Sequence, residues 1–129
     1  MSEDNLTVLL VEADEATRDL YHRALSQYFD VFIAATEMEA YELLQSREFE
    51  AVVLEPVLEQ GDGWRLLANI AKARPAAPPL TLVCSSVDDR KRGYHLGAHL
   101  YLVKPVLPAT LARTLRQALH SRSILRGHS

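Results

Sequence analysis

The stretch AVVLEPVLEQGDGW, residues 51–64, runs from four apolar residues into an acid, Glu55, and then into a turn. Its apolar part shows no alternation of apolar and polar side chains, which is typical of a strand covered on both faces of a parallel sheet. Gly61, Asp62 and Gly63 make the turn, and no lysine or serine follows them as a phosphate-binding loop requires. The stretch therefore predicts a buried parallel strand with a carboxylate at its carboxyl end.

Four other apolar runs, rich in β-branched residues, have the same character. Together with the first they predict five short strands, at residues 6–11, 31–34, 51–54, 80–84 and 100–103. Helical patterns lie between these runs. Because strands that alternate with helices favour right-handed crossovers and a parallel sheet covered on both faces, we expect an α/β fold.

Five helices are expected, and three of them carry clear start signals. Asp14 is a candidate N-cap of the first, and Thr36 with Glu39 forms a capping box at the second. Pro108 suits the first turn of the last helix. The fourth, at residues 88–96, has poor apolar spacing and is interrupted by a glycine. Residues expected to line the core-facing sides of the other four are Thr17, Leu20, Tyr21, Ala24, Leu25, Tyr28, Ala40, Leu43, Leu44, Leu66, Leu67, Ile70, Ala71, Leu111, Leu115, Ala118 and Leu119.

The chain has the size and composition of one globular domain. Its 129 residues can bury a single core, and 48% hydrophobic with 24% charged residues fits neither the disordered nor the fibrous class. We expect a single domain over residues 1–129, with its core at about 5–122 and a tail or linker at 123–129.

Several sequence features bear on the location of the protein. The start MSEDNL is acidic, whereas a secretory signal needs a basic start and an apolar stretch. No apolar run is long enough to span a membrane. Cys84 is the single cysteine, which excludes an internal disulfide and any CxxC metal or redox motif. We expect a cytoplasmic protein without a membrane partner.

Charge is distributed unevenly along the chain. Residues 1–63 carry 15 acids and 3 bases, whereas residues 64–129 carry 2 acids and 11 bases. From Arg90 onward there are 8 Lys or Arg residues and no acid. Such a basic segment attracts an acidic partner, and a solvated helix face is the plainer alternative.

Polar residues end four of the expected strands. Glu12, Glu55, Ser85 and Lys104 follow or close the first, third, fourth and fifth strands. Ligands of an open parallel sheet gather at the carboxyl ends of its strands, so we expect these side chains to converge. Two carboxylates, a hydroxyl and an ammonium suit phosphate chemistry, with one carboxylate as nucleophile and the other as a Mg²⁺ ligand. The five histidines show no metal-ligand spacing.

Four segments in order, VLLVEADEATR, AVVLEPVLEQGDGW, LVCSS and GAHLYLVKP, resemble the receiver domain of two-component response regulators. The family has an aspartate pair after strand one, a phosphoacceptor aspartate after strand three, Thr or Ser after strand four, and an aromatic residue before a Lys-Pro step. The resemblance implies a flavodoxin-like, doubly wound sheet of five parallel strands in the order 2-1-3-4-5 with five helices. It also implies that Tyr101 is the family's switch aromatic, although a half-buried strand residue is the alternative. Lys104 and Pro105 resemble the Lys-Pro step, where a cis bond is usual.

Two positions depart from the family's pattern. Ala13 stands where the family supplies its principal metal carboxylate, and Glu55 stands at the phosphoacceptor. We therefore expect Mg²⁺ binding to be weak or absent, with Glu12, Glu55 and the Val57 carbonyl as the remaining candidate ligands. Asp14 is better suited to cap a helix. The extra methylene of Glu55 moves the nucleophile, and a misplacement of about 1 Å costs roughly a hundredfold in rate, so efficient phosphorylation is not expected.

Glu55 is open to two interpretations. Its carboxylate accepts hydrogen bonds from Ser85 and Lys104 and holds the domain close to the activated arrangement without phosphate. Alternatively, Glu55 forms an ion pair with Lys104 that only neutralises a partly buried carboxylate.

The sequence predicts a pseudo-receiver that acts without phosphorylation by binding another protein, and not an enzyme. The family's partners and dimer mates most often use helix four, strand five and helix five. In this chain that surface carries Arg90, Lys91, Arg92, Arg113 and Arg116, so we expect an acidic protein partner or a homodimer there. One alternative is a working response regulator that accepts phosphate on Glu55, against which Ala13 argues. The other is a nucleic-acid-binding module that uses the basic last helix, against which the overall acidic charge argues.

Overall fold

The computed structural model describes the backbone of residues 5–127 and the side chains of residues 5–125. The strands are β1 (Thr7–Val11), β2 (Asp30–Ala34), β3 (Ala51–Leu54), β4 (Leu80–Ser85) and β5 (Leu100–Val103). The helices are α1 (Glu15–Ser26), α2 (Glu37–Ser46), α3 (Gly63–Ala73), α4 (Arg90–His95) and α5 (Pro108–Gly127). All four strand pairs are parallel, and the order is β2-β1-β3-β4-β5, which confirms the expected fold.

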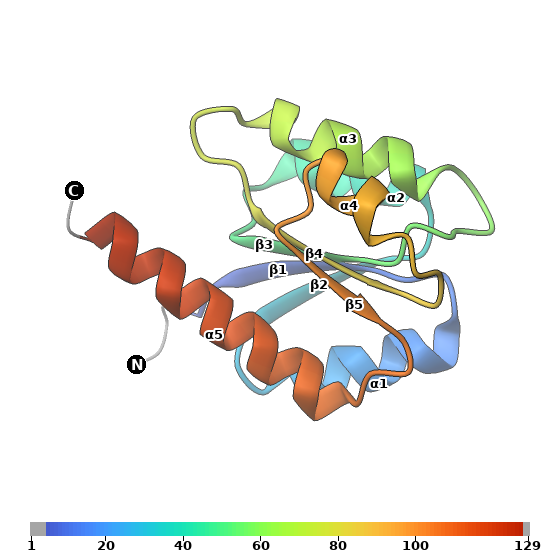
Figure 1. Ribbon diagram of the computed structural model, residues 1–129, viewed down its shortest axis with the longest axis horizontal. Coiled ribbons are helices and arrows are strands. Elements are labelled where there is room, and N and C mark those ends of the chain that lie inside the picture. Colours follow the sequence, from blue (N-terminus) through green and yellow to red (C-terminus); the bar gives the residue numbers. More distant parts are fainter. Residues whose placement is uncertain (1–4, 128–129) are drawn as a thin grey trace.

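The sheet lies between two layers of helices. Helices α1 and α5 cover one face, and α2, α3 and α4 cover the other (Figure 1). Alternate residues of each strand enter the two resulting cores: Val8 and Leu10 of β1 pack on the α1 and α5 side, whereas Leu9 and Val11 pack on the other. A strand buried on both faces therefore needs an unbroken apolar run, as the sequence has.

Helix starts follow the capping signals. The Asp14 carboxylate accepts a hydrogen bond from the Thr17 amide at 2.9 Å, and the Thr36 hydroxyl accepts one from the Glu39 amide at 3.1 Å. Glu39 turns back to the amide of Ala35, at 2.7 Å, one residue earlier than a capping box requires. These bonds satisfy amide groups that have no partner inside the helix.

Three residues expected at the core are exposed. Leu20 is 51% exposed and Tyr28 is 40% exposed, and Ala71 of α3 is also exposed. The expected apolar face of α1 is wider than the part that the sheet covers. Tyr21 and Leu25 are buried against the sheet, and Leu20 lies about 100° around the helix from Tyr21. The prediction for these three positions was wrong because tertiary packing decides which part of a broad apolar face is covered.

Helix α5 is longer than expected. Residues 123–127, which we expected to begin a tail or linker, continue the helix to Gly127, and residues 128–129 lie outside the described part. The C-terminal turns of α5 reach beyond the sheet (Figure 1). No helix within the described residues is long and apolar enough to cross a membrane.

Candidate functional site

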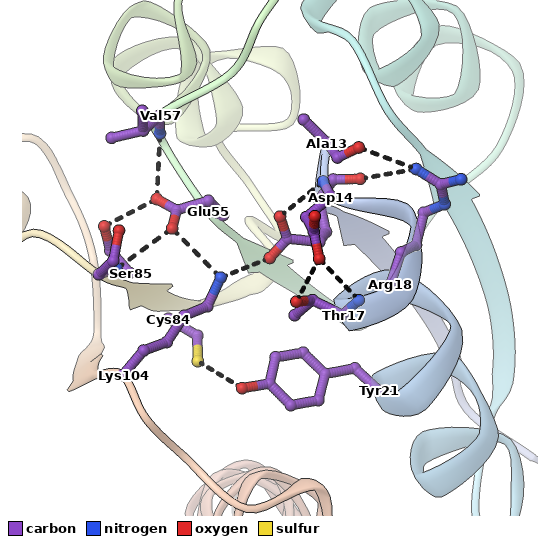
Figure 2. Close-up of polar contacts among 12 residues, drawn as sticks. Ala13, Asp14, Thr17, Arg18, Tyr21, Glu55, Val57, Cys84, Ser85 and Lys104 are labelled. Atoms are coloured by element: carbon purple, nitrogen blue, oxygen red, sulfur yellow. Dashed lines mark hydrogen bonds and ion pairs between the residues drawn. The ribbon is translucent and has the colours of Figure 1, made fainter.

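Four polar side chains meet at the carboxyl edge of the sheet, as the sequence predicts. Glu12 follows β1, Glu55 follows β3, Ser85 is the last residue of β4, and Lys104 follows β5. The loops after these strands bring the side chains together (Figure 2). Glu12, Glu55 and Ser85 are buried, with 3%, 5% and 0% of their surfaces exposed. A buried carboxylate requires hydrogen-bond donors or a cation, and each acid here has both.

Four donors hold the Glu55 carboxylate. Its Oε2 accepts hydrogen bonds from the Ser85 hydroxyl at 2.7 Å and from the Val57 amide at 3.0 Å. Its Oε1 accepts hydrogen bonds from the Ser86 amide at 3.2 Å and from the Lys104 ammonium at 3.2 Å. Each oxygen therefore has two donors, and the charge-assisted bonds among them offset the loss of water.

Lys104 bridges the two acids. Its Nζ lies 2.6 Å from Oε1 of Glu12 and 3.2 Å from Oε1 of Glu55. The other oxygen of Glu12 accepts a hydrogen bond from the Asp14 amide at 3.0 Å. Burial by itself lowers the pKa of Lys104, but the hydrogen bond and charge of Glu12, together with the charge of Glu55, raise it above the ordinary lysine value. The ammonium is therefore a fixed positive charge between two carboxylates.

The surrounding residues do not fit Mg²⁺ well. Ala13 offers no carboxylate, and Lys104 binds the carboxylates of Glu12 and Glu55 that remain. Asp14 is the N-cap of α1, and its carboxylate accepts hydrogen bonds from the hydroxyl and the amide of Thr17, which lower its pKa. Over residues 5–125, no three His, Cys, Asp or Glu side chains form a cluster able to hold a metal ion. An ion that demands near-octahedral oxygen ligands meets an ammonium and a methyl group instead.

Tyr101 points inward and connects β5 to the loop after β4. It is 5% exposed, its hydroxyl donates a hydrogen bond to the carbonyl of Val87, and it accepts one from the Asp89 amide at 3.2 Å. Its ring lies against Gly93 of α4, where an added Cβ would come within 2.5 Å of the ring. The glycine that weakened the prediction of α4 is therefore the residue that makes room for Tyr101.

The Lys104-Pro105 bond is cis, as the resemblance implies.

The sequence analysis missed several groups around the site. Arg18 donates hydrogen bonds to the carbonyls of Glu12, at 3.1 Å, and Ala13, at 3.4 Å. The amides of Val57 and Ser86 contact Glu55, but backbone donors leave no sequence signal beyond their place directly after a strand.

Glu37 is a third buried acid, and the sequence analysis did not single it out. It accepts hydrogen bonds from the Asp62 amide at 2.9 Å and from two nitrogens of Arg65, at 2.8 and 2.6 Å. The hydrogen bonds from Arg65, ahead of the one from Asp62, lower the pKa of Glu37 to about 2. Gly61, with a φ of +99°, passes so close that an added Cβ would lie 2.3 Å from the Cβ of Glu37. This contact fixes the β3–α3 loop to α2.

The basic residues predicted for the partner face lie on two helices, α4 and α5. Arg90, Lys91 and Arg92 are on α4, and the Arg92 guanidinium stacks 4.4 Å from the centre of the Trp64 ring. Arg113 and Arg116 are on α5, which covers the other face of the sheet (Figure 1). Both line a groove between α1 and α5. We therefore distinguish an α4 cluster (Arg90, Lys91 and Arg92) from the α1–α5 groove that Arg113 and Arg116 line.

Comparison with known proteins agrees with this geometry. Residues 8–116 match the response regulator receiver domain family. The chain is 30% identical over 116 residues to the probable transcriptional regulatory protein SilR of Salmonella typhimurium, which covers 88% of this chain and 51% of SilR. It is 28% identical over 116 residues to the transcriptional regulatory protein CusR of Escherichia coli K12, with the same coverage of both chains. The chain thus spans about half the length of these relatives.

Solved structures of receiver domains have the same fold. A CheY-like response regulator receiver domain protein from Methanospirillum hungatei JF-1 has a TM-score of 0.84 at 24% identity, over 92% of this chain and 97% of that one. The signal receiver domain of an HD domain-containing protein from Pseudomonas fluorescens Pf-5 has a TM-score of 0.82 at 28% identity, over 97% and 94% of the two chains. By the family match and by these relatives, the chain belongs to the response regulator receiver domain family.

Proposed function

We propose that this receiver domain signals without phosphorylation, by binding another protein. One observation carries the proposal: the Glu55 carboxylate accepts hydrogen bonds from the hydroxyl of Ser85 and the ammonium of Lys104. In the family's chemistry, a hydroxyl and an ammonium at these places would hold phosphoryl oxygens. A side-chain carboxylate that binds the same donors supplies part of what a phosphoryl group would supply.

The same contacts disfavour phosphoryl transfer to Glu55. Both oxygens of the carboxylate accept two hydrogen bonds each, so an attacking oxygen would first have to give up a donor. Ala13 removes a metal ligand, and we propose that Mg²⁺ binds weakly or not at all. Without the metal, little remains to neutralise the charge that develops on a transferring phosphoryl group.

The position of Tyr101 supports an arrangement held permanently close to the activated one. The hydroxyl is bonded to the loop that follows β4, and Ser85 and Ser86 at the start of that loop bond to Glu55. Glu55 and Tyr101 thus fix the same loop from its two ends. We infer that the loop and α4 keep one conformation, which a partner protein recognises.

Phosphorylation is tested by intact-protein mass spectrometry after incubation with Mg²⁺ and acetyl phosphate. We expect the parent chain to stay unmodified and an Ala13→Asp, Glu55→Asp double variant to gain a phosphoryl group. The two single variants show which position limits the chemistry. A phosphoryl group on the parent chain would overturn the proposal, because the domain would then be a working phosphoacceptor.

A further inference from the structure

A groove between α1 and α5 has an amphipathic and strongly basic lining. Its volume is about 480 Å³, and its lining includes Leu20 and Arg23 from α1, Tyr28 from the turn after α1, and Arg113 and Arg116 from α5. Among the residues whose side chains the structure describes, no acidic residue lines it, although α1 carries acids elsewhere on its surface. Three guanidinium groups around one groove make a local positive field in a chain whose net charge is −3.

Two large apolar side chains of the groove are exposed to solvent. Leu20 of α1 and Tyr28 of the turn after it are 51% and 40% exposed, although the sequence predicts that both are buried. The Arg116 guanidinium stacks 4.0 Å from the centre of the Tyr28 ring. This cation–π contact orders the arginine and the ring before any ligand binds, which lowers the entropy cost of binding.

We propose that the α1–α5 groove binds an acidic, amphipathic protein segment, with an apolar side chain against Leu20 and Tyr28 and carboxylates at Arg23, Arg113 and Arg116. The inference rests on the proposed function, in which the domain acts by binding a protein, and it specifies the surface and the chemistry of the partner. Guanidinium groups favour bidentate contacts with carboxylates, and the exposed leucine and tyrosine favour an apolar anchor.

A protein segment fits the groove better than a nucleic acid does. The rest of the lining is mostly small and apolar, and among Ala24, Gln27, Pro108, Ala109 and Ala112 only the Gln27 amide could bond to a base edge or a sugar. The acid-rich first half of the chain would also repel a long polyanion as it approaches. A short acidic segment avoids this repulsion because its charges need only meet the three arginines.

The experiment selects ligands from a displayed library of random peptides of about 12 residues, on the scale of a short helix along the groove. We expect peptides selected on the immobilised full chain to combine Asp or Glu with one large apolar residue. The best peptide is then synthesised with a fluorescent label and titrated in solution. Arg113→Glu and Arg116→Glu should each raise its Kd at least about tenfold, since each reverses a charge that meets a carboxylate.

Matched controls separate the groove from general charge. Lys72→Glu also replaces a positive charge by a negative one, at an exposed position of α3 outside the groove, and should leave the Kd within about twofold. A peptide with Lys in place of one Glu should bind Arg113→Glu better than it binds the parent, because the charges are then complementary again. Arg116→Gln removes the charge with a milder effect on packing, and circular dichroism of each variant checks its fold.

Three results would overturn the inference. Selected peptides without acidic residues would do so, as would an unchanged Kd for both arginine variants or a loss of binding in Lys91→Glu of the α4 cluster. Self-association of the chain that is lost in Arg113→Glu, measured by sedimentation, would assign the groove to a second copy instead. None of these results changes the mass measurement on Glu55, so failure of the groove and failure of phosphorylation-independent signalling are distinguishable.

Discussion

At the scale of single residues, one methylene group and one missing carboxylate determine the chemistry of the site. Glu55 is long enough to reach the hydroxyl of Ser85 and the ammonium of Lys104 at the same time. Ala13 leaves Glu12 as the one acid of the family's pair, and Lys104 lies 2.6 Å from it. The site is thus closed by contacts among its own residues.

Glu55→Gln tests the strength of this closure. The glutamine amide has the shape of the carboxylate but carries no charge. Its NH₂ group would also face one of the four groups that donate hydrogen bonds to Glu55, so one of those bonds is lost. We expect the free energy of unfolding to fall by about 2 kcal/mol, less than for a fully broken buried pair because Lys104 keeps Glu12. Urea denaturation measures the loss, and the exposed Glu59→Gln is the control. A loss no larger than that of the control would show that the closure contributes little to stability.

Because of Glu37, the free energy of unfolding should depend on pH in the acid range. Its folded-state pKa of about 2 lies below the ordinary value of 4.5, so its ion pair with Arg65 stabilises the fold fully above about pH 5. That contribution falls as the pH is lowered through 4.5 and is lost near 2, because the unfolded chain takes up the proton more readily. Urea midpoints between pH 6 and pH 2.5 should fall less steeply in Glu37→Gln than in the parent chain. Equal slopes would mean that other groups account for the acid sensitivity.

At the scale of elements, the contact between α4 and β5 depends on a glycine. Tyr101 has its buried position only because Gly93 has no side chain to meet the ring. The glycine also costs α4 helical stability, and the helix has only six residues. The packing of one aromatic ring thus takes precedence over the stability of an isolated helix.

Gly93→Ala should therefore destabilise the domain, although alanine in a helix interior ordinarily stabilises by about 0.5–1 kcal/mol. We expect a net loss of about 1–3 kcal/mol, as in other overpacked cores, and a changed near-ultraviolet circular dichroism spectrum from displaced Tyr101. In a Tyr101→Ala background the same change should become neutral or stabilising, and the double-mutant cycle isolates the contact. Equal effects in both backgrounds would place the cause elsewhere.

At the scale of the whole molecule, topology made much of the structure predictable. Parallel strands bring their carboxyl ends to one edge, so Glu12, Glu55, Ser85 and Lys104 had to converge once their strands were identified. How much of the apolar face of α1 the sheet covers depends on how the helices pack, which apolar spacing does not report. The exposure of Leu20 was missed for this reason.

Opposite charges in the two halves of the chain also bear on how partners approach. The first half carries most of the acids and the second half most of the bases, and the α1–α5 groove takes Arg23 from one half and Arg113 and Arg116 from the other. The negative net charge of the molecule repels a long polyanion at long range, whereas the basic groove attracts a short acidic segment at close range. The charge distribution therefore favours the proposed acidic segment over a long polyanion.

Helix α5 is a long rod that is held near its C-terminal end. Its 20 residues span about 30 Å, and one side of its first half lines the groove, whereas its last turns extend past the sheet with Ile124 and Leu125 exposed. Arg122 donates a hydrogen bond to the carbonyl of Pro78 at 2.7 Å and so anchors that end to the loop before β4. A tilt of about 10° around this anchor would move the first turn of α5, about 20 Å away, by roughly 4 Å, and the last turn by much less. Movement of α5 is therefore concentrated at the end that lines the groove.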